Sequence, residues 1–330
     1  MLNAEYERRA NDAETGGRGE AETRPATSKP PSSIRASVLS LQPLPGQPFP
    51  GIPNIFNHGV YDHIGRGAGP SVVRGCIFVN CAASGMTQGA GGAIDDCLFI
   101  HNGMATDAWT GNETGAITNC VCLGSKQCPA WAAGGGLTLM SKSGRVENNV
   151  AAHGSPPQKG AGLMLWSNKG HEAEIPPDAS ALFRHNVVFD WPADGFYVAT
   201  TRSRVEFRAN CVAKCPQRTI DIIDMSDAQY VFHNNRYEQS NGTFVLKQKP
   251  MTFDAFAQAV NETGGKMEEA VHFPDPNRTI ESYAKSIGLE SRLDAFMAAA
   301  DAQARYHWDD QLTAAAVNDY IRQGFGITRQ

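Results

Sequence analysis

The sequence predicts a right-handed parallel β-helix, a solenoid of about eight stacked coils with a C-terminal α-helical cap. Three observations support this prediction: a strand block that recurs at intervals of 21 to 37 residues, a glycine-led strand type that alternates with it, and a change to helical spacing near residue 250. We therefore divide the chain into a disordered or tethering tail (1–35), the β-helix (36–250) and the helical cap (251–330).

The recurring block reads VVRGCIFVN, AIDDCLFIH, AITNCVCLG, RVENNVAAH, LFRHNVVFD, EFRANCVAK and VFHNNRYEQ. Aligned, the blocks place one small side chain in the same column, at intervals of 21, 23, 29, 37, 24 and 25 residues: Cys76, Cys97, Cys120, Asn149, Asn186, Asn210 and Asn235. A period in the twenties with insertions is typical of a solenoid. Because coils stack about 4.8 Å apart, a buried asparagine can bond its own coil and the asparagine of the next. We interpret the cysteines as packing groups in the same column.

The second strand type reads HGVYDH, SGMTQG, GGLTLM, AGLMLW, DGFYVA, TIDIID and TFVLK, with a degenerate copy near Met104–Trp109. Each begins with a small or turn residue and then alternates between core and surface. The alternation predicts these inward positions: Val60, Met86, Leu137, Leu163, Phe196, Ile220 and Phe244. It predicts that the following residues share one outward face: Tyr61, Thr87, Thr138, Met164, Tyr197, Asp221 and Val245.

The two ends of the chain differ from the middle. Residues 1–35 are polar and broken by glycine and proline, so they bury too little apolar surface to offset their ordering entropy. We expect an arm that can dock to a protein partner. After residue 250 the apolar residues have helical spacing, with Thr252 and Asp275 as expected helix starts and Gly288 and Gly324 as expected ends. We expect this segment to cover the strand edges of the last coil.

Composition excludes several classes of function. Charged residues make up 19% of the chain and the net charge is −5, which argues against the concentrated basic surface of a nucleic-acid binder. No apolar run reaches the length needed for membrane insertion. The first residues, MLNAEYERRANDAETGG, lack the apolar core of a signal peptide, so the compartment stays open. The eight cysteines have no paired C-x-x-C spacing, and we expect no structural metal among them.

Over residues 55–250 the alternation of G-[LF]-x-[LV] with [VF]-x-x-N-x-[VF] strands resembles the pectate-lyase-like superfamily of right-handed β-helix proteins. The helical segment is also similar to a bacterial subgroup with a DP-x-R-T…Y…LG…LDAF…W…AAAVNDYIR-x-GFG pattern, here Asp275, Pro276, Arg278, Thr279, Tyr283, Ile287–Gly288, Leu293–Phe296, Trp308 and Ala314–Gly326. The superfamily resemblance implies a polysaccharide partner and an extracellular or periplasmic location. The NTD…DD…GHG…RIK series of polygalacturonases and the YG-x-DPH motif of mannuronate epimerases are both missing. Function must therefore be argued from a site.

Three aromatic residues are candidate sugar contacts. Tyr61, Trp166 and Tyr197 lie at steps that the alternation places on the outward face. Aromatic rings with a polar edge offer a flat apolar surface to a sugar ring. A tryptophan at such a step can equally cover a neighbouring loop.

Basic residues in the middle coils are candidate groups for a lyase. Arg202 and Arg204 follow the DGFYVA strand and could hold a uronate carboxylate by paired hydrogen bonds, which makes the proton alpha to it removable. His153, Lys159 and Lys169 are candidate bases. Each of these residues could instead be a solvated turn residue.

Two carboxylates suggest hydrolysis. Asp221 and Asp224 could serve as acid and base if their pKa values diverge, with Asp190 and Asp194 as a second set. Asp224 has the opposite parity to Asp221 unless the strand ends between them. These carboxylates could bind a calcium ion, although no loop has calcium-binding spacing. We expect no other cofactor.

The sequence leaves three functions open. The first is a carbohydrate-active enzyme, with a lyase acting on an acidic, uronate-containing glycan in a lateral groove favoured over a hydrolase. The second is a non-catalytic glycan-binding or tailspike-type β-helix, supported by the missing catalytic signatures and the polar N-terminal arm. The third is a degenerate or truncated relative without activity.

Overall fold

The computed structural model describes residues 33–35, 38–40, 59–62, 70–81, 84–89, 91–103, 108–110, 114–126, 135–155, 160–166, 176, 178–199, 203–224, 229–240, 242–304 and 306–329. All of them belong to one unit, Pro31–Gln330. For β1, β2, β9, Tyr61 and Asp224 only the backbone is described. No helix in the described ranges is long and apolar enough to span a membrane.

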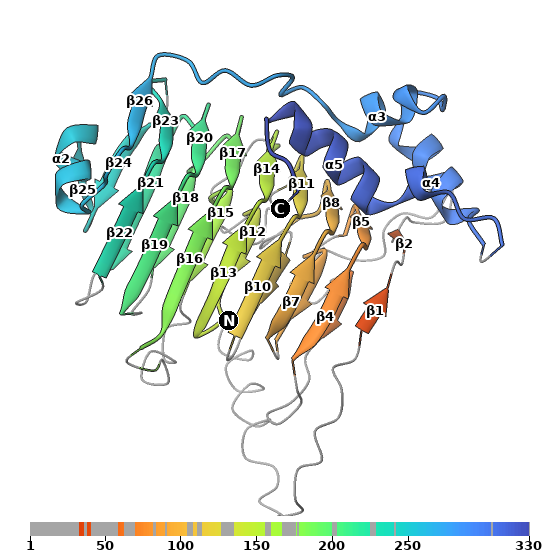
Figure 1. Cartoon of the computed structure of the whole chain (residues 1–330), viewed down its shortest axis with the longest axis horizontal. Coiled ribbons are helices and arrows are strands. Elements are labelled where there is room, and N and C mark those ends of the chain that lie inside the picture. The colour runs from red at the N-terminus through yellow and green to blue at the C-terminus, as the bar shows by residue number, and fades with distance from the viewer. Residues whose placement is uncertain are drawn as a thin grey trace, which may run out of the picture. The chain divides into compact units, whose positions relative to one another are not determined.

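The chain winds as a parallel β-helix whose three sheets, called A, B and C, run along its length (Figure 1). The strands of sheet A are β1 (Ser33–Arg35), β4 (Ser71–Arg74), β7 (Gly92–Asp95), β10 (Thr114–Thr118), β13 (Ser143–Glu147), β16 (Ser180–Arg184), β19 (Arg204–Arg208) and β22 (Gln229–His233). Those of sheet B are β2 (Val38–Ser40), β5 (Ile77–Val79), β8 (Leu98–Ile100), β11 (Val121–Leu123), β14 (Val150–Ala152), β17 (Val187–Phe189), β20 (Cys211–Ala213), β23 (Arg236–Glu238) and β26 (Lys266–Glu268). Those of sheet C are β3 (Val60–Asp62), β6 (Met86–Gln88), β9 (Ala108–Thr110), β12 (Leu137–Leu139), β15 (Leu163–Trp166), β18 (Phe196–Ala199), β21 (Arg218–Asp224), β24 (Thr243–Leu246) and β25 (Lys249–Met251).

The solenoid class and its C-terminal helices are confirmed. Every described strand pair is parallel except β24 with β25, which form an antiparallel hairpin at the end of sheet C. Strand β1 pairs with β4, and β26 pairs with β23, so the ladders extend past residues 36 and 250. The number of coils also differs slightly from the eight that the sequence predicts.

The predicted column stacks in register at the turn between sheets A and B. The side chains of Asn149 and Asn186 donate to Oδ1 of the next asparagine at 2.9 Å each, and Asn210 Nδ2 does so to Asn235 at 3.1 Å. Each side-chain amide also donates to a backbone carbonyl of the neighbouring coil. The ladder therefore satisfies buried polar groups that the turn would otherwise leave without partners.

The cysteines continue this column toward the N-terminal coils. Cys97 and Cys120 are fully buried, and their thiols each donate to a carbonyl of the preceding coil at 3.7 Å. Burial raises the pKa of Cys97 well above its ordinary value, so this thiol is inert. No disulfide links the cysteines that the structure describes.

The short strands of sheet B are bounded by left-handed residues on both sides. The preceding positions have positive φ in every coil from β5 to β26: Gly75, Asp96, Asn119, Asn148, His185, Ala209, Asn234 and Gly264. A second positive-φ column follows the strands: Asn80, His101, Gly124, His153, Asp190 and Lys214. Glycine, asparagine and aspartate tolerate this conformation best, which explains their frequency in the repeat.

Glycine opens the strands of sheet C because coils approach closely there. A Cβ atom on Gly136 would lie 2.2 Å from the carbonyl oxygen of Gly162, and one on Gly162 would lie 2.4 Å from Val188. Glycine is therefore required at this step for packing, although neither residue has positive φ.

The core inside the coils is a set of stacked rows. Sheet A contributes an aromatic row in which the rings of Phe183, Phe207 and Phe232 stack at 5.1 and 4.5 Å between centroids. Sheet C contributes the predicted inward residues, which pair in register from β3 to β24. Helix α2 (Phe253–Ala259) closes this core at the C-terminal end, where Phe256 contacts Phe232 and Phe244.

The remaining helices correct the prediction of a cap over the last coil. Helices α3 (Ile280–Ser286), α4 (Leu293–Asp301) and α5 (Ala314–Gly324), with the 3₁₀ turn η2 (Asp310–Leu312), run back along the outward face of sheet B (Figure 1). Helix α5 lies on β8 and β11, and α4 lies beside β2. Together they bury a second apolar cluster that includes Ile77, Val79, Leu98, Ile100, Val317 and Ile321. Among the helices that the structure describes, α2 alone covers the last coil.

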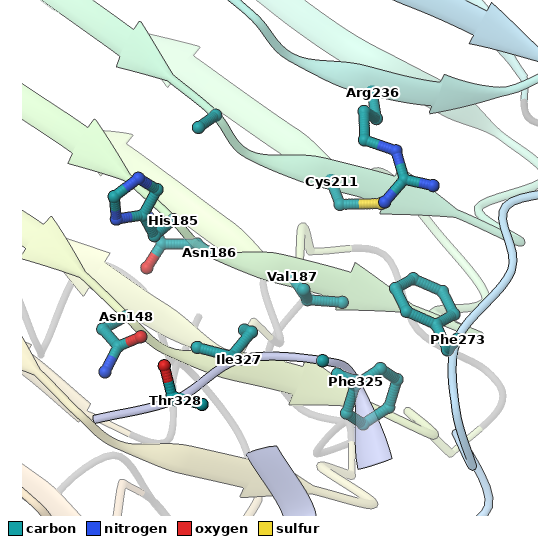
Figure 2. Close-up of a pocket in the computed structure, with 12 residues that line it drawn as sticks. Asn148, His185, Asn186, Val187, Cys211, Arg236, Phe273, Phe325, Ile327 and Thr328 are labelled. Atoms are coloured by element: carbon teal, nitrogen blue, oxygen red, sulfur yellow. The ribbon is translucent and has the colours of Figure 1, made fainter. Parts of the chain in front are cut away.

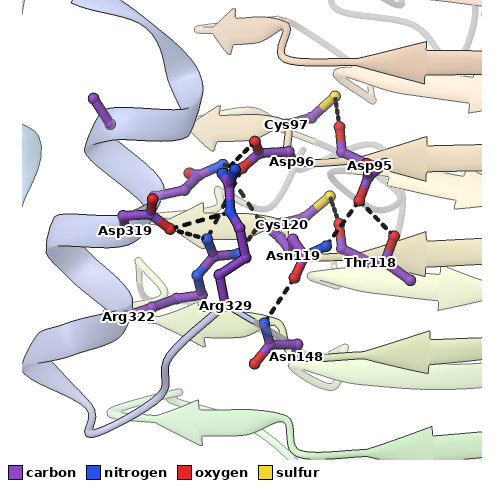
Figure 3. Close-up of polar contacts among 12 residues, drawn as sticks. Asp95, Asp96, Cys97, Thr118, Asn119, Cys120, Asn148, Asp319, Arg322 and Arg329 are labelled. Carbon is purple, nitrogen blue, oxygen red and sulfur yellow. Dashed lines mark hydrogen bonds and ion pairs between the residues drawn. The ribbon is translucent and has the colours of Figure 1, made fainter. Parts of the chain in front are cut away.

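Polar contacts fix the position of α5 on sheet B (Figure 3). Arg322 is fully buried and donates to the carbonyl of Asn119 at 2.6 Å and to Asp319. Arg329 forms an ion pair with Asp96 at 2.5 Å.

The C-terminal sequence pattern contributes to this docking and to the packing of the helices on one another. Arg278 donates to the Tyr320 carbonyl at 2.8 Å and stacks on the Tyr320 ring, while Thr279 caps α3 in place of the expected Asp275. Tyr283 donates to the carbonyl of Gln311 at 2.8 Å. These pattern residues therefore have structural roles.

Candidate functional site

The strongest cluster of titratable groups in the described residues lies on the outward side of sheet C. It contains Asp194, Tyr197, Arg218 and Asp221, and Trp166 lies on the same side of the sheet one strand further along. In register, Met164 of β15 pairs with Tyr197 of β18, which pairs with Asp221 of β21. Residues about two dozen positions apart are thus brought side by side.

Two bulges in β21 bring its charged residues onto this side. Arg218 and Asp221 are three residues apart, so regular alternation would place them on opposite faces. The register shifts between Arg218 and Ile220, which restores a common face. A second shift pairs Ala199 with Asp224, and Ala199 in turn pairs with Trp166. The backbone of Asp224 therefore lies in the same outward row as Trp166, although regular alternation would place it on the inward face.

Arg218 joins the two carboxylates. Its Nε and a terminal nitrogen donate to the two oxygens of Asp194 at 2.9 and 2.8 Å, and the other terminal nitrogen donates to Oδ2 of Asp221. One N–H therefore remains on each terminal nitrogen of the guanidinium. The second oxygen of Asp221 is buried without a hydrogen-bond partner in the described part of the chain.

Burial controls the ionisation of the cluster. Asp194 and Asp221 are each only 1% exposed. Burial raises the pKa of Asp194 to about 6, against the opposing hydrogen bonds from Arg218. Burial also raises the pKa of Asp221, and burial together with the charge of Asp221 raises the pKa of Tyr197. At neutral pH Asp194 is therefore close to its own titration range.

The outward face of sheet C is open only in places. Trp166 and Tyr197 are partly exposed, and the Arg218 side chain is 37% exposed. In contrast, Thr87, Thr138 and Met164 share the predicted outward row but are buried. The row is confirmed as a register, but it does not form one open trough along the solenoid.

Two predicted lyase residues lie elsewhere. His153 follows sheet B, where its ring contacts Asp190 at 2.9 Å and the Pro276 carbonyl at 3.0 Å, so it ties the C-terminal segment to the coil. Arg204 begins β19 of sheet A and donates to Glu206 at 2.5 Å and Gln229 at 2.9 Å. Neither shares a face with Trp166 and Tyr197.

Other candidates fall on undescribed parts of the chain. Lys159, Lys169 and Arg202 lie outside the described residues. Tyr61 pairs with Thr87 and Asp224 with Ala199, but their side chains are outside the description as well. Their predicted roles stay predictions.

A groove of about 250 Å³ separates the turn of sheets A and B from the C-terminal tail (Figure 2). Phe325, Ile327 and Thr328 of the tail face Asn148 and the strands of sheet B. The groove also contains Cys211, whose pKa burial raises to about 12. Arg236 at its edge is bound by both oxygens of Glu268, at 2.7 and 2.9 Å. Asn148 Oδ1 lacks a hydrogen-bond partner in the described residues, but the arginine of the groove is already paired and its thiol stays protonated, so the groove is a weaker candidate than the sheet C cluster.

No group of three or more histidine, cysteine, aspartate or glutamate side chains that could hold a metal ion occurs in the described ranges. In the sheet C cluster the cation beside the carboxylates is Arg218 itself.

Sequence reasoning found Tyr197, Trp166 and Asp221, and it noted Asp194, but it missed Arg218. The odd spacing between Arg218 and Asp221 placed them on opposite faces, and the sequence carries no clear bulge signal at Thr219. Thr219 is fully buried and donates to the Gly242 carbonyl at 2.7 Å, which is how the extra residue is accommodated.

Comparison with known proteins agrees with this architecture. The family model of the right-handed β-helix region matches residues 59–254. The chain belongs to this family of right-handed β-helix proteins. No curated protein and no solved structure shows a significant match.

Proposed function

We propose that this chain is a carbohydrate-active β-helix protein that holds a glycan against the outward face of sheet C between β15 and β21. The observation that carries the proposal is the arrangement of Trp166, Tyr197 and Arg218. Two partly exposed aromatic side chains and a guanidinium with two spare N–H groups lie on one face, about one coil apart. Aromatic rings stack on sugar rings, and guanidinium N–H groups bond sugar hydroxyls or carboxylates.

The two aspartates support this role by holding Arg218 in place. Because Asp194 accepts two hydrogen bonds from the guanidinium, the orientation of the Arg218 side chain is fixed before a ligand binds. A preorganised donor loses less entropy on binding than a free surface arginine.

Hydrolysis is a second candidate function, favoured by the pKa of Asp194 at about 6. A protonated Asp194 could donate to a glycosidic oxygen while an ionised Asp221 stabilises positive charge or activates water. Both carboxylates are buried, so this chemistry requires Arg218 to move first. The expected lyase chemistry rests on Lys159, Lys169 and Arg202 and stays a prediction.

Glycan binding tests the proposal directly. An array of neutral and acidic oligosaccharides is probed with the full chain and with Trp166→Ala and Tyr197→Ala. Each variant should bind the retained glycans at least tenfold more weakly. Trp308→Ala removes an equally large but more exposed indole outside sheet C and should leave binding unchanged. Equal affinity in the parent chain and both sheet C variants would refute the proposal.

Product analysis separates the possible reactions. The retained glycans are incubated with the protein, and new chain ends are measured. Saturated reducing ends that disappear in Asp194→Asn indicate hydrolysis. Ultraviolet-absorbing unsaturated ends indicate the lyase reaction. Binding without new ends of either kind indicates a non-catalytic module.

A further inference from the structure

A hollow of about 340 Å³ lies on the outward face of sheet A, over strands β4, β7, β10, β13 and β16. Its floor is formed by Ala93 and Ala116, which pair in register between the larger side chains of Val72 and Arg145. Because two successive coils contribute only a methyl group here, the surface sinks between its neighbours. Within the hollow, the neighbouring outward row runs in register from Arg74 to Arg184.

Arginine side chains form the walls of this hollow. The side chains of Arg74, Arg145 and Arg184 are 65%, 59% and 42% exposed, whereas those of Asp95 and Glu147 are each 16% exposed. The arginines cover the carboxylates: Arg74 pairs with Asp95 at 2.7 Å, and Glu147 is shared by Arg145 at 3.3 Å and Arg184 at 3.0 Å. A ligand that approaches the hollow therefore meets guanidinium groups first.

The guanidinium groups retain hydrogen-bond donors. Arg74 and Arg145 use only Nε in their ion pairs, which leaves their terminal nitrogens without a partner in the described residues. Arg184 uses one terminal nitrogen, and its Nε is buried without a partner. The terminal N–H groups of the three arginines that these ion pairs leave over are the donors that a bound acceptor can use.

We propose that this hollow binds an acidic oligosaccharide, a short stretch of carboxylated or sulfated glycan, at a site separate from sheet C. Strands β4 and β13 are three coils apart, about 14 Å along the solenoid. Acidic groups of one extended ligand can thus reach Arg74 at one end and Arg145 with Arg184 at the other. The inference does not depend on the proposed glycan site of sheet C.

The mixed chemistry of the hollow selects a sugar over other anions. Three arginines face two carboxylates, so the local charge is only slightly positive, unlike the strongly basic surface that nucleic acid requires. The Thr118 hydroxyl donates to Asp95 at 2.7 Å and keeps its acceptor lone pairs, so it can accept from a sugar hydroxyl at the edge of the hollow. A ligand with both acidic groups and hydroxyls satisfies the two kinds of partner at once.

The test uses isothermal titration of the full chain with an oligogalacturonate of defined length and with its fully methyl-esterified form. The acidic form should bind, and its affinity should fall as salt is raised, because the contacts are exposed ion pairs. The esterified form, which has the same backbone without the charge, should bind at least tenfold more weakly.

Three variants locate the site. The pair Arg145→Gln with Arg184→Gln should weaken binding at least tenfold. Ala116→Leu fills the hollow without changing the charge and should do the same. Arg292→Gln removes an exposed arginine at the start of α4, on the sheet B side of the solenoid, and should leave the affinity unchanged. Circular dichroism confirms that each variant is folded.

The outcomes separate this site from sheet C. Loss of binding in the hollow variants but not in Trp166→Ala supports the inference, whatever the fate of the proposed function. Loss only in Trp166→Ala places the ligand on sheet C and overturns the inference while the proposed function stands. A third outcome is that Ala116→Leu leaves binding intact and that single-stranded DNA competes equally with the oligosaccharide. This outcome indicates a general polyanion surface and also overturns the inference.

Discussion

Sheets A and B have the same inward design but opposite outward surfaces. Inside the solenoid both contribute buried apolar rows to one core. Outside, sheet B presents apolar residues at both outward positions of its strands from β5 to β20, such as Ile77 with Val79 and Leu98 with Ile100. Sheet A presents exposed arginines over partly covered carboxylates. The inward rows therefore specify the coil, and the outward rows decide what each face contacts.

The difference determines where the C-terminal segment goes. A continuous apolar strip from β5 to β20 is costly to leave in water. Helices α3 to α5 cover it, and buried polar contacts set their position. The described strands of sheet A carry no such strip, and their arginine side chains stay partly exposed.

The largest expected effect comes from disrupting the covered face. Arg322→Leu removes a fully buried cation that neutralises Asp319, lies near Asp96 and bonds the Asn119 carbonyl. Because Asp319 is 40% exposed and Asp96 keeps Arg329, most of the cost comes from the buried Asn119 carbonyl and the lost packing, and it should total about 3 kcal/mol. Urea unfolding should show this loss, and increased binding of a hydrophobic dye should report that α5 has left sheet B.

A matched variant sharpens that result. Arg329→Gln removes a second ion pair to Asp96, but this arginine is 45% exposed. Its loss should cost at most about 1 kcal/mol. If both variants lose the same stability, burial does not explain the docking of α5.

Much of the fold could be predicted because the inward rows obey simple periods. The column from Cys76 to Asn235 and the paired rows of sheet C were found by alignment of the sequence with itself. These positions can be recognised in the sequence because stacked coils with a closed core require equivalent residues at equivalent positions of each coil. In the triplet Ile77–Val79 all three residues are apolar, which indicates a strand buried on both faces. This pattern would have predicted that the helices pack on the outward face of sheet B.

The candidate site was less predictable because it depends on departures from the period. Trp166 and Tyr197 lie on the predicted face, but Arg218 reaches it only through a bulge. His153 follows the repeat rule as a turn residue, and its contact with Pro276 joins segments 123 residues apart. Long-range packing of this kind leaves no periodic trace in the sequence.

The asparagine ladder at the turn between sheets A and B is the feature that the two sheets share, and it can be tested by substitution. Asn186→Ala removes the acceptor for Asn149 and the donor to Asn210 and to the Val146 carbonyl, all buried. Several buried polar groups without partners cost about 3 kcal/mol together. Denaturant unfolding measures the loss.

The cysteine half of the ladder supplies the control. Cys97→Ala keeps a small apolar side chain and loses only weak thiol contacts at 3.4 and 3.7 Å. We expect a loss of about 1 kcal/mol. A loss as large as that of Asn186→Ala would show that packing volume, rather than hydrogen bonding, dominates the column.

Sheet C has a third kind of outward face, which contains buried charged groups. For this face we expect the free energy of unfolding to depend on pH. The pKa of Asp194 rises from 3.8 to about 6 on folding, so the folded state binds the proton more tightly. Stability from this group is therefore complete below pH 3.8 and declines as the pH rises to about 6, by about 2–3 kcal/mol. The difference in unfolding free energy between Asp194→Asn and the parent should change across this window. A difference that stays constant with pH contradicts the assignment.

The smallest expected effect belongs to the open face. Arg204 and Arg208 both pair with Glu206, and their side chains are 40% and 46% exposed. Exposed ion pairs contribute about 0–1 kcal/mol, so Arg204→Gln with Arg208→Gln should change the free energy of unfolding by less than about 1 kcal/mol. Thermal and urea unfolding of this double variant, beside Arg322→Leu, compare two exposed arginines with one buried arginine. A loss of several kcal/mol would mean that sheet A needs these two arginines for its stability.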